Sequence, residues 1–121
     1  VGSGGSIIVN NSFAVLSPLW DNGSVTDAGA VTWINGLTGS GGIVSSSNSL
    51  VGSTNGDNVG NNVILTNFLT NLNYIVRSSN WDNGTTVNAG AVTFGNGSTG
   101  VTGTITTCNS VPGLTKLLFL N

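Results

Sequence analysis

The four residues Trp20-Asp21-Asn22-Gly23 decide the fold of this chain, because they return as Trp81-Asp82-Asn83-Gly84 in a sequence of 121 residues. A similar passage follows each copy: residues 27–33 read DAGAVTW, and residues 88–94 read NAGAVTF. We call two residues equivalent when they are separated by the same offset as Trp20 and Trp81. The chain therefore contains two copies of one unit, which we place at residues 1–58 and 59–121 and expect to pack as one domain.

Short runs typical of β-strands occur in each unit. They lie at residues 7–9, 13–16 and 28–33 in the first unit and at 74–77 and 89–94 in the second, and they are bounded by Asn, Gly and Ser. Residues 101–106 alternate Val, Gly and Ile with Thr, so we expect a fourth strand there and a weaker counterpart at 41–45. No stretch has a sustained apolar period of 3.6 residues, so the sequence predicts no long helix.

Asn-Gly pairs punctuate both units, beginning at residues 22, 35, 55, 83 and 96. This pair is a strong signal for a tight hairpin turn, because both residues tolerate a positive φ. The small residues Ala28, Gly29 and Ala30 follow the first turn and would let a neighbouring backbone come close. We therefore expect antiparallel hairpins, with a neighbouring sheet or backbone close to these small residues.

About four short antiparallel strands in each unit match one blade of a β-propeller. One such sheet cannot cover both of its own faces, and repeat folds usually need at least three units. The sequence thus predicts an all-β fold of two tandem four-stranded units. It leaves two arrangements open: propeller-like blades completed by association between chains, or an eight-stranded β-sandwich.

The amino-acid composition excludes some classes of binding partner. Charged residues make up 5% of the chain, and the net charge is -2. Two basic residues, Arg77 and Lys116, cannot form the basic surface that nucleic acids or anionic membranes require. No apolar run approaches the roughly 18 residues of a membrane span. Few charges leave self-association weakly opposed, so we expect the partner to be a copy of the chain itself. The polar positions are filled by Asn, Ser, Thr and Gly, a composition that resembles exported surface proteins, so we expect an extracellular or cell-surface location.

The two ends suggest how copies would meet. The chain finishes on an apolar run, and an unpaired terminal strand of that kind would promote aggregation. We expect this run to pair with the first strand or with a neighbouring subunit, giving a filament or a closed ring. The assembly residues would be Ile7, Ile8, Val9, Leu117, Leu118, Phe119 and Leu120.

With its Trp-Asp-Asn-Gly and Ala-Gly-Ala-Val-Thr-(Trp/Phe)-x-Asn-Gly motifs, the chain resembles bacterial repeats found in tandem arrays of large secreted and surface proteins, including filamentous-haemagglutinin-like ones. The likeness covers about residues 12–60 and 73–113. It implies β-repeat structure, an extracellular location and an adhesive or structural role. The chain departs from long arrays in having two units and an apolar tail, which favours assembly between chains.

Catalysis and metal binding find little support. The chain lacks His and Glu, so acid-base chemistry would fall to Asp21, Asp27, Asp57 and Asp82. Of these, Asp21 and Asp82 are equivalent, and an Asp beside a turn commonly bonds its own backbone. We expect no enzyme activity and no cofactor. Calcium is the ion that the oxygens of Asp21, Asn22 and Asp27 would suit, although their spacing matches no EF-hand.

Sugar recognition is the alternative function, since aromatic platforms beside Asn and Asp suit glycans. It would give a lectin-like module that completes a β-propeller by oligomerisation. The competing interpretation is that the aromatic residues fill the core, with each Trp Nε1 finding a local partner. The ligand-binding candidates are Trp20, Asp21, Asn22, Trp81, Asp82 and Asn83.

Two further features concern modification. Asn-x-Ser/Thr sequons, the acceptors of N-glycosylation, begin at Asn10, Asn22, Asn83 and Asn96. Cys108 has no second cysteine to pair with in the chain and aligns with Ser47. We expect it to be a small buried or half-buried side chain. The alternative is that it forms a disulfide with a second copy of the chain.

Overall fold

A computed structural model describes residues 1–9, 11–39, 42–65 and 73–113. Within these ranges the chain forms strands and no helix, so no helix there could cross a membrane. The strands are β1 (Gly5–Val9), β2 (Ser12–Ser17), β3 (Ala30–Ile34), β4 (Ser49–Val51), β5 (Asn62–Leu65), β6 (Tyr74–Ser78), β7 (Ala91–Gly95), β8 (Gly103–Thr104) and β9 (Ser110–Pro112).

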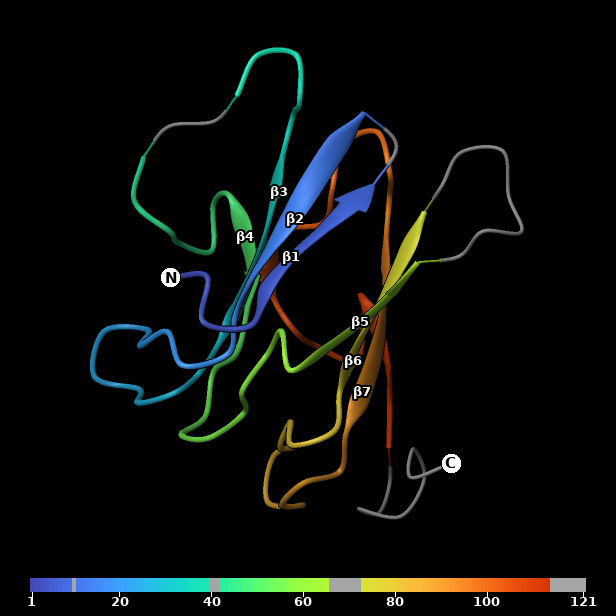
Figure 1. The fold of residues 1–121 in the computed structure, drawn as a ribbon. Coiled ribbons are helices and arrows are strands. Elements are labelled where there is room, and N and C mark those ends of the chain that lie inside the picture. The colour runs from blue at the N-terminus through green and yellow to red at the C-terminus, as the bar shows by residue number, and fades with distance from the viewer. Residues whose placement is uncertain (10, 40–41, 66–72, 114–121) are drawn as a thin grey trace.

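The strands form two sheets that pack against each other (Figure 1). One sheet has the order β1-β2-β3-β4-β8, and the other has the order β5-β6-β7-β9. Strands β1 to β4 and strands β5, β6, β7 and β9 are antiparallel meanders of the same design. The predicted all-β fold of two tandem four-stranded units is confirmed.

The predicted fourth strands are confirmed only in part. The fourth strands of the two meanders are β4 and β9. A strand, β8, does lie within residues 101–106, but it leaves its own sheet and adds in parallel to β4 of the first unit (Figure 1), while residues 42–45 form no strand. Ile105 continues this crossing: its backbone N–H donates to the Val51 carbonyl at 3.1 Å, and its side chain is buried in the core. Alternation along a strand shows which side chains share a face, but it does not show which sheet the strand joins.

The two sheets pack front to back. We call the face of each sheet that carries Phe13 and Val15, or their equivalents in the second unit, its front face. The opposite, back face carries Ala14, Val31 and Leu50 or their equivalents. In the first sheet the back-face residues are fully buried, and they share one core cluster with Tyr74 and Val76 on the front face of the second sheet.

The linker between the two meanders, residues 52–61 between β4 and β5, runs past Gly29, one of the small residues at which the sequence predicts a close approach. A Cβ added to Gly29 would lie 2.2 Å from the backbone nitrogen of Val59. The Val59 N–H donates to the Ala28 carbonyl at 3.1 Å, and Val59 itself is fully buried. The prediction of a close backbone approach at these small residues is confirmed.

A pair of equivalent glycines tests the packing between the sheets. Gly39 and Gly100 have φ values of +68° and +77°. A Cβ on Gly100 would lie 2.5 Å from the Trp33 Cβ, whereas one on Gly39 would meet nothing within 4 Å. We expect Gly39→Ala to cost about 1 kcal/mol, the backbone cost alone, and Gly100→Ala to cost roughly 1–3 kcal/mol more because it overpacks the core. Urea unfolding at low protein concentration measures both, and equal losses would contradict this front-to-back contact.

Candidate functional site

The repeated motif forms a tight turn in both units. Asn22 and Val25 exchange backbone hydrogen bonds of 2.9 and 3.0 Å, so Gly23 and Ser24 form the tip. Gly23 has a φ of +63°, while Ser24 and Asn22 are not among the residues with positive φ. This is the pattern of a type II′ hairpin, which needs glycine at its first central position. The predicted tight turn is confirmed, but it lies within the loop between β2 and β3, where Asn22 and Val25 form an isolated bridge, and it does not join two strands. Asn22 flanks the tip of the turn instead of forming half of it.

Side chains of the motif hold the loop that follows the turn. Asp21 Oδ1 accepts from the Asp27 N–H at 2.9 Å, and Asp82 Oδ1 accepts from the Asn88 N–H at 2.8 Å. Asp27 and Asn88 have φ values of 51° and 52°, a left-handed conformation in which Asp and Asn are the usual non-glycine residues. The carboxylates of the motif thus satisfy backbone donors in their own loops.

The motif's asparagines have a matching role. The Asn22 amide donates to the Gly52 carbonyl at 3.1 Å, and the Asn83 amide donates to the Gly113 carbonyl at 3.3 Å. Each bond joins the turn to the residue that follows the unit's fourth strand. Both units therefore have Asn at this position because its amide connects the turn to the end of the unit's fourth strand.

Asp57, in the linker, joins the two units. Its side chain is fully buried. Oδ2 accepts from the backbone N–H groups of Ser53 and Thr54, both at 2.9 Å, and Oδ1 accepts from the Asp82 N–H at 3.1 Å. A single carboxylate thus ties the end of the first unit to the repeated motif of the second. Burial raises the pKa of Asp57 above its ordinary value of 3.8, against the opposite effect of these backbone hydrogen bonds.

Asn58 extends the same joint. Its side-chain amide donates to the Pro18 carbonyl at 3.1 Å, and its Oδ1 accepts from the Asn80 amide at 3.1 Å. The linker therefore contacts both units through consecutive polar residues. Sequence reasoning missed this role for Asp57, although an acidic residue in an Asn- and Gly-rich linker of so charge-poor a chain was a signal that could have drawn attention to it.

The tryptophans do not share one environment. Trp81 is 4% exposed and belongs to the core between the sheets, whereas Trp20 is half-buried. Among the described residues, Nε1 of Trp81 and Nε1 of Trp33 have no hydrogen-bond partner, so the expectation of a local partner for each indole is wrong there. Burial also raises the pKa of Tyr74 in this core to about 12. Trp81 is therefore core material with little surface to offer a ligand.

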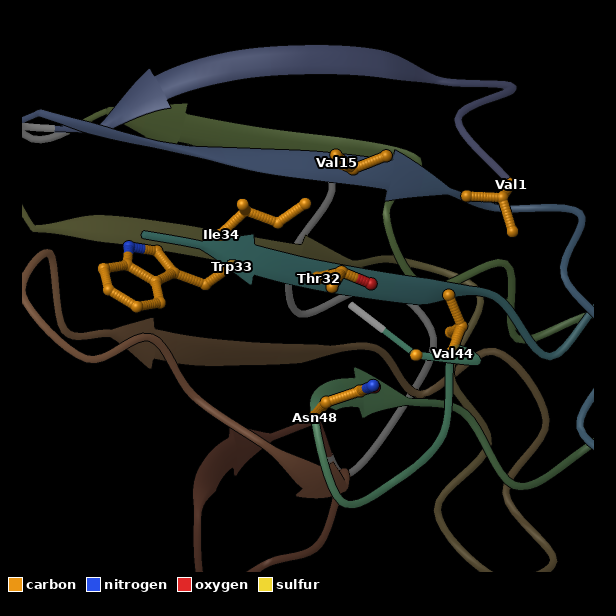
Figure 2. A pocket seen from close by; sticks show the side chains of 8 residues that line it. Val1, Val15, Thr32, Trp33, Ile34, Val44 and Asn48 are labelled. Atoms are coloured by element: carbon orange, nitrogen blue, oxygen red, sulfur yellow. The ribbon is translucent and has the colours of Figure 1, made fainter. Parts of the chain in front are cut away.

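Two apolar surfaces of the described part of the chain are open, one on each sheet. The front face of the first sheet carries a hollow of about 150 Å³ beside Val15, Thr32 and Ile34. Figure 2 shows these side chains on β2 and β3, with Val44 and Asn48 from the loop before β4 and Val1 from the N-terminus. The back face of the second sheet carries a hollow of about 330 Å³ beside Ile75, Val92, Phe94 and Val111.

Comparison with protein families matches residues 7–61 and 68–116 to a model described as "Repeat of unknown function (DUF5650)". The chain belongs to this repeat family. The two matched segments begin at residues 7 and 68, in agreement with the offset between the two copies of the motif. Comparisons with curated proteins and with solved structures give no significant match.

The predicted assembly residues of this DUF5650 chain fall into two groups. Ile7, Ile8 and Val9 lie in the edge strand β1, while residues 117–120, predicted to pair with that strand or with a neighbouring subunit, lie outside the described residues. As for metals, no group of three or more His, Cys, Asp or Glu side chains suited to an ion occurs in the described part of the chain. Of the side chains considered for calcium, Asp21 accepts a hydrogen bond from the Asp27 N–H, and the Asn22 amide donates to the Gly52 carbonyl.

The modification sites are placed as follows. Asn96 is exposed, and its Oδ1 caps the backbone of Ser98 and Thr99. Asn22 and Asn83 are half-buried with their amides engaged, and Asn10 lies outside the described residues. Cys108 is exposed, so the expectation of a buried or half-buried side chain is wrong. The reason is its place in a surface turn, where its N–H donates to Thr106 Oγ1.

Removing the Asp57 carboxylate should loosen the joint between the repeats. Asp57→Ala leaves three backbone donors without their acceptor, so we expect a loss of about 3 kcal/mol in the free energy of unfolding. Asp21→Ala removes an exposed carboxylate that accepts one bond, and it should cost much less. Denaturant unfolding measures both variants, and a similar small loss in each would show that the buried carboxylate does not hold the joint.

The raised pKa of Asp57 predicts how stability depends on pH. Because the folded state binds this proton more tightly than the unfolded state, the Asp57 contribution to the free energy of unfolding rises as pH falls through the folded pKa. The rise levels off below the ordinary value of 3.8. Unfolding of the wild type and of Asp57→Asn between pH 7 and 4 should therefore diverge in favour of the wild type as pH falls; parallel curves would contradict the assignment.

Proposed function

We propose that the chain is a non-enzymatic extracellular structural or adhesive protein that self-associates into a filament or a closed ring. The observation that supports this proposal most directly is the open back face of the second sheet. Phe94 and Val111 on that face are 56% and 66% exposed, whereas Leu50, which is equivalent to Val111, is fully buried between the sheets. Contiguous exposed apolar surface of this kind is typical of interaction sites.

Charge and composition support association of like copies. The chain has four acidic and two basic residues, so repulsion between copies is weak at any ionic strength. The residues that line the two hollows have uncharged side chains. A surface with so few ionisable groups also suits an exterior environment of variable pH and salt. The resemblance to filamentous-haemagglutinin-like surface proteins is the basis for the extracellular location and for the adhesive role.

The lectin-like alternative is weaker. It needs equivalent aromatic platforms in the two repeats, and Trp81 is buried between the sheets. Asp21 and Asp82, which would hold the sugar hydroxyls, already accept backbone hydrogen bonds in their own turns. Trp20 is the remaining candidate platform. Self-association therefore accounts for more of the exposed surface than sugar binding does.

Acidic substitutions on the surface test the proposal. We expect the wild type to associate with rising concentration in sedimentation velocity, and Val111→Asp to weaken association about 100-fold because a charge would be buried in the contact. Leu37→Asp is the matched control: Leu37 is 86% exposed, but it lies in a turn and its equivalent Ser98 is also exposed. A wild type that stays monomeric at all concentrations would refute the proposed function.

A further inference from the structure

We infer that a second copy of this chain docks on the open back face of the second repeat with the front face of its own first repeat. This inference rests on the proposed self-association and names its surfaces. The contact between copies would reproduce the contact that the structure already shows between the two repeats within one chain. Three sets of equivalent residues lead to this conclusion.

The first set is the back face. Ala14, Val31, Trp33 and Leu50 pack against the front face of the second sheet. Their equivalents are Ile75, Val92, Phe94 and Val111, which share one face of the second sheet and line its hollow. The second repeat thus presents an apolar surface of the same design as the one that the first repeat buries.

The second set is the front face. Tyr74 and Val76 fill the contact between the repeats, and both are fully buried. Their equivalents Phe13 and Val15 lie on the open front of the first sheet, where Phe13 is 37% exposed and Val15 lines the hollow of Figure 2. The open front face of the first sheet therefore corresponds to the front face that is buried within the chain, and the open back face of the second sheet corresponds to the back face that it covers. A contact in which the front face of one copy pairs with the back face of the next is a head-to-tail contact.

The third set is a strand edge. Within the chain, β8 adds to β4 with Leu50 opposite Gly103 and Val51 opposite Thr104. The equivalent of β4 is β9, which is the last strand of its sheet among the described residues. The equivalents of Gly103 and Thr104 are Gly42 and Ile43, which lie outside any strand, and Ile43 is 88% exposed. A docked copy would place its Ile43 opposite Pro112.

A glycine supports the same register. Gly100 lies against the Trp33 side chain, with space too small for a Cβ, and the equivalent Gly39 has open space around it. In the proposed contact, Gly39 of one copy would lie against Phe94 of the other. Since head-to-tail contacts leave one open face of each kind, they generate a ring when the rotation closes and a filament when it does not.

Disulfide trapping tests the register. In a Cys108→Ser background, which places in the second repeat the serine found at residue 47 of the first, Ile43→Cys and Pro112→Cys are made in separate chains. Neighbouring strands hold opposite Cα atoms about 5 Å apart, within the range of a disulfide. We expect a mixture of the two variants to form disulfide-linked dimers on mild oxidation at least about 10-fold faster than either variant alone.

Two controls make the outcome decisive. Leu37→Cys replaces Ile43→Cys as an equally exposed cysteine outside the contact, and it should not crosslink to Pro112→Cys. Gly39→Ala should weaken association in sedimentation while the monomer loses only the backbone cost of its new side chain. Association without the mixed crosslink, or crosslinking of each variant mainly with itself, would overturn the front-to-back register alone. Absence of any association by the wild type would refute the proposed function as well.

Discussion

A four-stranded sheet with apolar side chains on both faces cannot bury both faces by itself, and this constraint governs the whole molecule. Strand β2 shows the problem in four residues, because Phe13 and Val15 point to the front of the sheet while Ala14 and Leu16 point to its back. The chain covers one back face with the next sheet's front face. The linker that runs past Gly29 and the crossing of β8 both fix that one contact.

Polar side chains replace charges as the means of holding the loops. Thr32 and Ser49 share a hydrogen bond of 2.7 Å, and Thr93 and Ser110 share one of 2.6 Å at the equivalent place. Asn35 and Asn96 cap the turns after β3 and β7 in the same way. The positions at which the two repeats agree are thus mainly positions at which a side chain satisfies a backbone donor or a buried hydroxyl. The most conspicuous repeated motif, Trp-Asp-Asn-Gly, is accounted for by the turn and the hydrogen bonds that it forms in each unit, and it carries little information about a ligand.

Local patterns in the sequence predicted local structure well. Alternating apolar runs, Asn-Gly turns and the repeated motif were enough to place β1, β2, β3, β6 and β7 and to divide the chain into two sheets. Features that depend on tertiary contacts could not be predicted from the sequence. Nothing in the alternation of residues 101–106 indicates that β8 joins the sheet of the other repeat, and nothing in a linker sequence indicates that Asp57 becomes fully buried. The exposure of Cys108 has the same origin, since a serine in the other repeat fits a surface turn as well as a core.

The joint within the chain and the proposed joint between chains differ in one respect that bears on their strength. Asp57 locks the internal joint with hydrogen bonds to both repeats, and its equivalent in the second unit is Leu118, a residue type without a carboxylate. The internal contact also uses the larger indole of Trp33 where the open face has Phe94. A contact between copies would therefore keep the apolar part of the interface and lack its buried polar lock. Such a contact would be weaker than the internal one, so the two-repeat unit would form first and then associate reversibly as a preformed block.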